Sequence, residues 1–169
     1  MTVADDIAKR IGEGVLEEEI ASRIQSSILP GEIDVEGLEI AAGMLPADKV
    51  GGDYYDIIPV EDGCWIAIGD VAGHGLAAGL IMLMIQSTLQ GLVKLSPQAN
   101  PRDLICALNR VLYENIRKRM KRDEHITFCL VRYWADGRLS FAGAHESLIV
   151  CRASGEVETL SSKSRTGSA

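Results

Sequence analysis

The spacing of apolar residues changes along the chain from a helical repeat to an alternation. In the first segment, isoleucines recur four residues apart, which is typical of one face of an α-helix, and Pro30 then ends the pattern. The residues at this spacing are Ile7, Ile11, Ile20, Ile24 and Ile28. The pattern predicts an N-terminal amphipathic linker helix over residues 1–29, followed by a domain over residues 30–169.

Within that domain, strand patterns and helix patterns both occur. Apolar stretches bounded by Gly, Pro and Asp predict strands. These cover residues 38–44, 53–61, 64–70, 126–134, 139–144, 148–152 and 157–160. An apolar helix is expected over residues 76–94, and a second helix begins with Asn100 as its cap and Pro101 at its first position. Antiparallel strands around a pair of helices define an α+β fold.

One predicted hairpin has a turn sequence that indicates its register. The pair Asp62-Gly63 strongly favours a two-residue turn, so the flanking strands are expected to pair with Asp70 opposite Tyr55. Side chains alternate between the two faces of a strand. The residues predicted to share one face are Asp53, Tyr55, Ile57, Ile66, Ile68 and Asp70.

Two carboxylates, those of Asp53 and Asp70, therefore come to one end of one face as diagonal neighbours, about 7–8 Å apart at the backbone. Like charges on an apolar face repel unless a proton is shared or a cation lies between them. The glycine-rich residues 71–75 that follow supply backbone carbonyls, and hard cations such as Mg²⁺ and Mn²⁺ prefer such oxygen ligands. The alternative is that each aspartate is only a turn or cap residue.

The order and spacing of three motifs resemble one family. They are Val50-Gly51-Gly52-Asp53-Tyr54-Tyr55-Asp56, Ile68-Gly69-Asp70-Val71-Ala72-Gly73-His74-Gly75 and Phe141-Ala142-Gly143-Ala144-His145-Glu146. Together they resemble the metal-dependent protein phosphatases (PPM, the protein phosphatase 2C superfamily) of the bacterial SpoIIE/RsbU type. The resemblance implies an antiparallel β-sandwich flanked by α-helices. It also implies hydrolysis of phosphoserine or phosphothreonine on a protein.

The resemblance carries a ligand set and partners with it. It implies that Asp53, Asp70 and the Val71 carbonyl bind metal, with two Mn²⁺ or Mg²⁺ ions in the complete domain. The implied substrate is a phosphorylated regulatory protein, an anti-anti-sigma-factor domain in bacterial partner switching. Residues 1–29 resemble the linker to an upstream sensor or receiver domain, and a homodimer through this helix is a further expectation.

One departure from the family concerns its late metal-binding aspartates. The chain has no aspartate after Asp136, and Asp136-Gly137 is itself predicted to be a hairpin turn. The expectation is a phosphatase domain that lacks its C-terminal part. The alternative function is a catalytically silent phosphoprotein-binding module with an incomplete metal site.

Composition narrows the function classes further. A formal net charge of −7 argues against nucleic acid as a partner, because phosphate backbones require a basic surface. The basic run over residues 117–122 is expected to be a solvated helix end, with an acidic docking partner as the alternative. Because Gly79 and Gln86 interrupt the longest apolar stretch, no membrane span is predicted. The acidic N-terminus does not resemble a signal peptide, so cytoplasmic residence is expected.

Other polar residues are weighed against structural roles. His74 and His145 are candidate proton donors, but a lone histidine beside a turn is more often structural. Asp56 is predicted on the face opposite Asp53, which favours a supporting role over metal ligation. The four cysteines are dispersed and are expected to be reduced core residues. They are Cys64, Cys106, Cys129 and Cys151.

Overall fold

The computed structural model describes residues 16, 18–31, 33–45 and 50–160. A helix over residues 18–28 precedes the domain. The elements that follow are β1 (Asp53–Val60), β2 (Gly63–Val71), α2 (Gly75–Leu95), α3 (Pro101–Tyr113), η1 (Glu114–Arg119), β3 (Ile126–Trp134), β4 (Leu139–Ala144), β5 (Leu148–Cys151) and β6 (Val157–Leu160).

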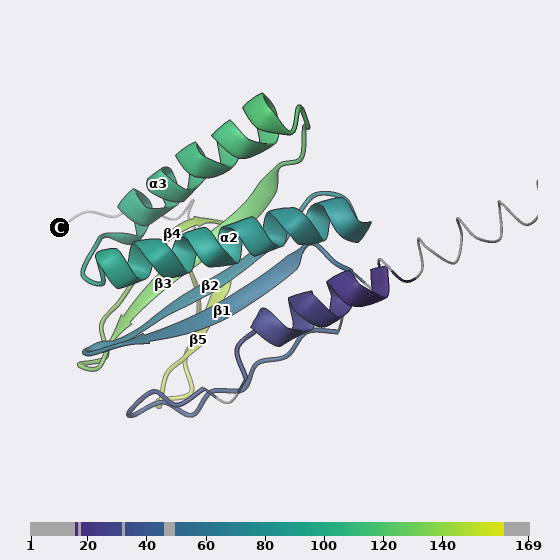
Figure 1. The fold of residues 1–169 in the computed structure, drawn as a ribbon. Helices are drawn as coiled ribbons and strands as arrows, with labels where there is room; N and C mark the ends of the chain where they lie inside the picture. Colours follow the sequence, from purple (N-terminus) through teal and green to yellow (C-terminus); the bar gives the residue numbers. More distant parts are fainter. Residues whose placement is uncertain (1–15, 17, 32, 46–49, 161–169) are drawn as a thin grey trace, which may run out of the picture.

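The described strands form two antiparallel sheets. One sheet has the order β1-β2-β3-β4, and the other is the β5-β6 hairpin. Helix α2 packs against β1 and β2, and α3 packs against β3 and β4, so both helices cover the same face of the larger sheet (Figure 1). The α+β class and the antiparallel pairing predicted from the sequence are confirmed.

The core lies between these helices and the sheet. Trp65 and Leu130 of the sheet are fully buried, as are Ile81, Ile85 and Leu89 of α2. Burying one such side chain stabilises the fold by about 1.5–3 kcal/mol, so this layer supplies much of the driving force for folding.

The start of α3 shows how local sequence fixes an element. The Asn100 side chain accepts a hydrogen bond from the Arg102 amide at 2.9 Å, and Pro101 occupies the first helical position. The Asn100 side chain satisfies one unpaired donor of the helix N-terminus, and Pro101 removes another because it has no amide hydrogen, as the sequence predicts. The helix then widens into the π-helical η1.

The composition of α2 corrects the expectation that Gly79 and Gln86 interrupt its apolar stretch too much for a membrane span. By length and composition alone, Gly75–Leu95 meets the criterion for a membrane-spanning helix despite Gly79 and Gln86. In the fold, Ile81, Met82, Ile85, Leu89 and Val93 of α2 are fully buried in the core that the helix shares with the sheet and α3. Its apolar character is therefore explained by its position in the core.

The segment before β1 differs from the prediction. Residues 38–44 do not form a strand, and the structure shows only an isolated bridge between Val35 and Leu38. Instead, Leu38 and Ile40 pack with Ile33 against the second face of the sheet. The apolar residues of this segment pack against the sheet without pairing as a strand. A residue can bury its side chain without forming the backbone hydrogen bonds of a sheet.

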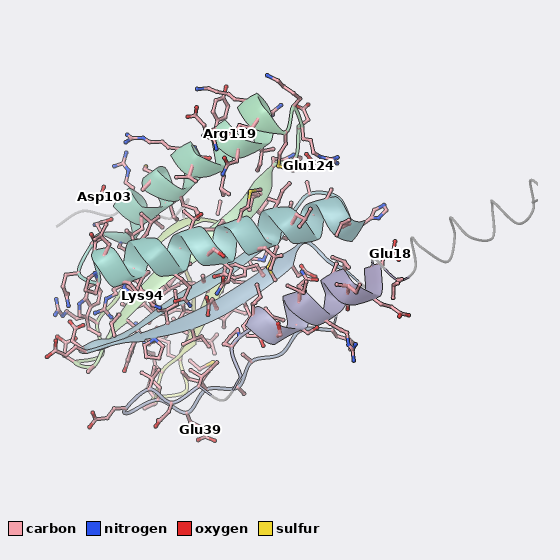
Figure 2. The ribbon with its side chains drawn as sticks, in the orientation of Figure 1. Glu18, Glu39, Lys94, Asp103, Arg119 and Glu124 are labelled. Atoms are coloured by element: carbon pink, nitrogen blue, oxygen red, sulfur yellow. The ribbon has the colours of Figure 1, made fainter. Side chains whose placement is uncertain are left out.

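Charged side chains lie around the outside of the domain, as the labelled residues in Figure 2 show. In the basic run, Arg117 pairs with Asp123, Lys118 with Glu114 and Arg122 with Glu124. Much of the positive charge is thus locally neutralised, which favours the solvated helix end over an acidic docking patch.

The cysteine prediction is half correct. Cys64 and Cys129 are buried, and burial raises the pKa of both thiols. Cys106 of α3 and Cys151 of β5 are exposed. All four are free thiols.

Candidate active site

Asp53 and Asp70 lie directly opposite each other in the β1–β2 ladder. The predicted register is wrong by two residues, because Val60 pairs with Gly63 and the turn is formed by Glu61 and Asp62. A shift of two residues preserves which side chains share a face, so the predicted shared face is confirmed. The correction brings the carboxylates closer than the predicted diagonal arrangement.

The backbone hydrogen bonds beside Asp53 and Asp70 show which type of cross-strand pair these two residues form. The Val71 amide donates to the Gly52 carbonyl at 3.1 Å, so the neighbouring pair of Asp53 and Asp70 occupies a non-hydrogen-bonded position. At such positions the side chains stand closest, with Cβ atoms about 4.5–5.5 Å apart. Both aspartates are exposed. Within the described ranges, no lysine, arginine or histidine pairs with either carboxylate.

Gly52 keeps the space beside this pair open. A Cβ atom on Gly52 would lie 2.4 Å from the Val71 carbonyl oxygen and 3.2 Å from Oδ1 of Asp70. These two oxygens therefore border one small space that any larger residue would fill. Three oxygen donors, two carboxylates and one carbonyl, lie around this end of the hairpin, and such a set suits a hard divalent cation. We call this part of the molecule, residues 50–53 and 70–72, the acidic end.

Contacts from two helices hold the chain that leads into Asp53. Gln25 of the N-terminal helix donates to the Gly51 carbonyl at 2.7 Å and accepts from the Gly51 amide at 3.2 Å. The Gly75 amide, at the start of α2, donates to the Val50 carbonyl at 3.2 Å. Gln25 is buried, so these are strong constraints on the backbone next to Asp53.

The polar row continues across the sheet. Asp70 pairs with Thr127 of β3, and Thr127 Oγ1 lies 2.8 Å from Nδ1 of His145, just beyond β4. Asp53 and His145 both line a cavity of about 680 Å³ on this face, together with apolar residues of β1, β2 and the segment before β1. A cavity of this size is typical of a binding site.

The ligand set around the acidic end is small. In the described part of the chain, no group of three or more His, Cys, Asp or Glu side chains comes together. The acidic end therefore offers two carboxylates and backbone oxygens. This donor set fits one hard divalent ion whose remaining positions are filled by water.

Asp56 lies on the opposite face from Asp53, as predicted. Its buried carboxylate accepts hydrogen bonds from the Tyr54 hydroxyl at 2.9 Å and from Gln90 of α2 at 3.0 Å. Burial, together with the neighbouring Asp56 carboxylate, raises the pKa of the Tyr54 hydroxyl far above its usual value. This network links β1 to α2 and takes no part in the acidic end.

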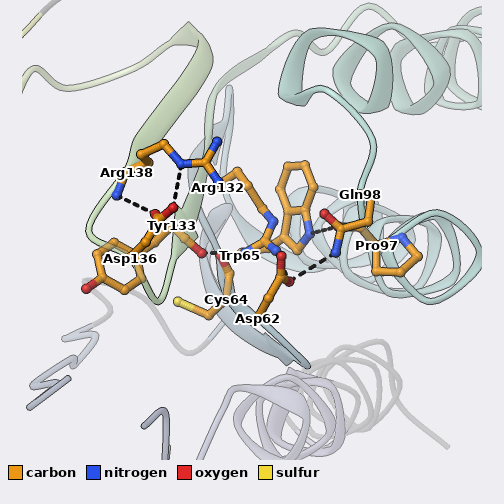
Figure 3. Close-up of polar contacts among 9 residues, drawn as sticks. All are labelled: Asp62, Cys64, Trp65, Pro97, Gln98, Arg132, Tyr133, Asp136 and Arg138. Atoms are coloured by element: carbon orange, nitrogen blue, oxygen red, sulfur yellow. Dashed lines mark hydrogen bonds and ion pairs between the residues drawn. The ribbon is translucent and has the colours of Figure 1, made fainter. Parts of the chain in front are cut away.

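The other end of the hairpin, around Asp62, is the turn end. Here the fully buried Arg132 pairs with Asp62, donates to the Cys64 and Tyr133 carbonyls and lies over Trp65 and Trp134. Gln98, from the α2–α3 loop, also donates to Asp62 at 3.1 Å (Figure 3).

Sequence reasoning missed Gln25, Thr127 and Arg132. Gln25 sits in a helix pattern among exposed polar residues, and its partner Gly51 is 26 positions away. Thr127 and Arg132 lie in the predicted strand Ile126–Trp134, and its apolar residues alone predict the strand. A signal for Arg132 did exist, since a lone arginine within an apolar strand implies a buried partner.

Among solved structures, the SiaA-PP2C domain of Pseudomonas aeruginosa is similar to this chain, with a TM-score of 0.64 and 26% sequence identity. The match covers 98% of this chain and 64% of that domain. The RsbU and RsbW domains of Rv1364c from Mycobacterium tuberculosis give a TM-score of 0.56 at 20% identity, over 69% of this chain and 32% of that one. The fold is that of a PP2C-type phosphatase domain.

The sequence comparisons narrow this class to one family. The family model for Stage II sporulation protein E (SpoIIE) matches residues 61–166, which include Asp70 and Val71 but not Asp53. The chain belongs to the SpoIIE family.

Two curated relatives are similar over part of this chain. The phosphoserine phosphatase RsbU of Bacillus subtilis (strain 168) is 35% identical over 101 residues, 59% of this chain and 30% of RsbU. The protein IcfG of Synechocystis sp. (strain ATCC 27184 / PCC 6803 / Kazusa) is 36% identical over 88 residues, 50% of this chain and 14% of IcfG. The chain thus spans less than a third of the length of either relative.

Proposed function

We propose that this chain belongs to a metal-dependent protein serine/threonine phosphatase that acts on a regulatory phosphoprotein in bacterial partner switching. The observation that carries the proposal is the direct opposition of Asp53 and Asp70 beside the Val71 carbonyl, with no cation from the described chain between them. The likeness to RsbU, a phosphoserine phosphatase, supports the reaction class.

Asp53, Asp70 and the Val71 carbonyl would hold Mn²⁺ or Mg²⁺. Bound divalent ions supply the Lewis-acid chemistry of phosphoester hydrolysis, by lowering the pKa of water and neutralising phosphoryl charge. Gln25 and Gly52 keep the backbone next to these ligands in place. The cavity lined by Asp53 and His145 would receive the phosphorylated residue.

The partner that we propose is a phosphorylated anti-anti-sigma-factor domain in the cytoplasm. The test is phosphate release from such a domain, carrying phosphoserine, by the purified chain with Mn²⁺. We expect release to need Mn²⁺ or Mg²⁺, to stop with EDTA, and to disappear in Asp53→Asn and Asp70→Asn. Asp136→Asn, in an exposed turn, is the matched control and should release phosphate at the parent rate. Release that persists in EDTA or in Asp70→Asn would contradict the proposal.

A second candidate function is a catalytically silent phosphoprotein-binding module. It is favoured by the two-carboxylate ligand set of the acidic end among the described residues. Binding of the phosphoprotein, measured by calorimetry, with no phosphate release at saturating Mn²⁺ would select this alternative. Phosphate release that depends on Asp70 would eliminate it.

The N-terminal helix is proposed to couple the domain to an upstream sensor or receiver and to a second copy of the chain. Its residues Leu16, Ile20 and Ile24 are about half exposed and lie four residues apart, on one side of the helix. Ile20→Glu with Ile24→Glu should convert a dimer to a monomer in sedimentation analysis. A monomeric parent chain would contradict the dimer.

A further inference from the structure

One polar row crosses β1, β2 and β3 at the acidic end of the larger sheet and ends at His145, just beyond β4. Asp53 pairs with Asp70, and Asp70 pairs with Thr127. The β3–β4 register, in which Phe128 pairs with Ala144, places His145 next in the row, and its ring nitrogen Nδ1 lies 2.8 Å from Thr127 Oγ1.

The contact with Thr127 orients the His145 ring. In the protonated ring, which is the form that acts as an acid, Nδ1–H donates to the Thr127 hydroxyl oxygen, and the Nε2 proton lies on the other side of the ring. Within the described residues, Nε2 has no hydrogen-bond partner. His145 is half buried and lines the same cavity as Asp53, so this donor borders the space where we place the substrate.

The spacing suits a phosphoryl group between the two parts of the row. Neighbouring strands lie about 4.8 Å apart, so the Asp70 and His145 backbones, two strands apart, are separated by roughly 10 Å. The two side chains stand on the same face of the sheet with the smaller Thr127 between them, and a phosphate with its ester oxygen would fit above Thr127. The carboxylates would then lie toward the phosphoryl oxygens and His145 toward the ester oxygen.

We propose that His145 is a catalytic residue that donates the proton to the departing serine oxygen, with Thr127 as its positioning residue. The proposal rests on the phosphatase function given above. A water oxygen forms the new bond to phosphorus as the bond between phosphorus and the serine oxygen breaks. The serine oxygen takes the Nε2 proton, the attacking water releases one proton to solvent, and His145 regains its proton from solvent. The products are serine and inorganic phosphate.

The chemistry of the leaving group makes this role measurable. A serine alkoxide is a poor leaving group and needs a proton, whereas p-nitrophenolate is stable without one. Positioned proton donors contribute roughly 10²–10⁴-fold to rate. Loss of the donor should therefore affect the two substrates unequally, which loss of folding or of metal would not do.

The experiment compares kcat/KM on a phosphoserine protein and on p-nitrophenyl phosphate with Mn²⁺. We expect His145→Gln to lower kcat/KM on the phosphoserine protein by about 100-fold. On p-nitrophenyl phosphate, kcat/KM should fall by about tenfold or less. Thr127→Val should shift the ratio in the same direction by a smaller factor, and Thr127→Ser should restore it. The control is His125→Gln, which lies at the other cavity between α3 and the sheet and should leave the ratio unchanged. Equal losses on both substrates, or no loss on phosphoserine, would overturn the proposal.

A second measurement separates this proposal from the proposed function. If the parent chain hydrolyses neither substrate, the phosphatase proposal fails for this chain, and NMR then decides the role of His145. The chain has three histidines, so single substitutions assign their ring signals. O-phosphoserine with Mg²⁺ should shift the His145 signal and leave the His125 signal in place. An unmoved His145 signal would overturn the placement of the substrate beside it.

Discussion

The two ends of the β1–β2 hairpin place carboxylates in opposite surroundings. At the turn end, the Asp62 carboxylate lies against the buried guanidinium of Arg132 and accepts a hydrogen bond from Gln98. At the acidic end, Asp53 and Asp70 face each other, and no cationic side chain of the described chain pairs with them. Among the described residues, the fold thus supplies a counter-charge at the turn end and none at the acidic end. Like charges in register repel, which is why we propose that a cation binds at the acidic end.

The two ends also differ in what holds them. Stacking and ion pairing fix the turn end, where Arg132 lies 4.8 Å from the Trp134 ring centroid and Trp65 donates to the Pro97 carbonyl at 3.1 Å. Hydrogen bonds to the backbone fix the acidic end, where the Gln25 side chain bonds both the carbonyl and the amide of Gly51. We therefore expect the turn end to contribute mainly to stability and the acidic end mainly to the proposed ligand binding. Each of the following predictions tests whether these roles are separable.

The largest expected effect on stability comes from Arg132→Met. This change removes a fully buried cation, removes the side-chain hydrogen bonds to the Cys64 and Tyr133 carbonyls and separates Asp62 from its partner. We expect a loss of about 2–4 kcal/mol in the free energy of unfolding, measured with urea, because the charge-assisted hydrogen bonds and the packing on two tryptophan rings are lost. Arg138→Met is the matched control, because Arg138 also lies over Trp134 but is exposed, and its loss should be below about 1 kcal/mol.

The Mn²⁺ affinity of Arg132→Met tests whether the turn end and the acidic end are independent. If the two ends are independent, Arg132→Met should bind Mn²⁺ as the parent chain does under conditions where both are folded. A parallel loss of Mn²⁺ affinity would show that the turn end also shapes the acidic end. A loss of stability no larger than that of Arg138→Met would contradict the structural role assigned to Arg132.

The second effect is expected from Gly52→Ala at the acidic end. Its Cβ would lie 2.4 Å from the Val71 carbonyl oxygen, so the strands must separate, at a cost of about 1–3 kcal/mol. Mn²⁺ affinity should fall as well, because the Val71 carbonyl and Asp70 move. Gly51→Ala is the control, since the nearest atom to its Cβ is 3.8 Å away. Similar behaviour of the two variants, by urea unfolding and Mn²⁺ titration, would show that close approach at Gly52 does not matter.

Sequence reasoning recovered the local features of the fold better than the long-range ones. The cap at Asn100, the strand Ile126–Trp134 and the shared face of Asp53 and Asp70 follow from neighbouring residues and from alternation, and all are confirmed. The register was wrong because Asp62-Gly63 is not the turn. In the structure, Asp62 is needed for Arg132, a partner 70 positions away.

The same limit explains the missed part of the site. Thr127 and His145 join the acidic end only through the order of the strands in the sheet, which no local pattern specifies. Residues 38–44 show the converse error, since a strand-like composition there serves packing alone. The metal-binding roles of Asp53 and Asp70, expected from the hairpin and from the family resemblance, and that of the Val71 carbonyl, implied by the resemblance, remain predictions.

A smaller effect, of opposite sign, is expected from Asp70→Asn without metal. The substitution removes the repulsion between directly opposed carboxylates, so the free energy of unfolding in EDTA should stay equal or rise by about 0.2–1 kcal/mol. In Mn²⁺ the order should reverse, because only the parent chain gains stability from the bound ion. Thermal melting of both chains, with and without Mn²⁺, gives the four values. A clear drop in melting temperature in EDTA would instead assign Asp70 a structural role.

The smallest effect concerns the pH dependence of stability at the turn end. Partial burial opposes ionisation of Asp62, but the Gln98 hydrogen bond and the Arg132 guanidinium outweigh it and hold the pKa of this carboxyl below its usual value. A lowered pKa in the folded state means that the carboxylate contributes stability above the unfolded pKa of about 3.9. This contribution is lost as the pH falls through the lower, folded value.

The difference in stability between the parent chain and Asp62→Asn should therefore be largest near neutral pH and shrink below pH of about 4. Urea unfolding of both chains across this range measures it, with Asp34→Asn as an exposed control. A difference that stays constant through the acid range would show that Asp62 acts at the turn end by shape alone, which would remove the electrostatic contrast between the two ends of the hairpin.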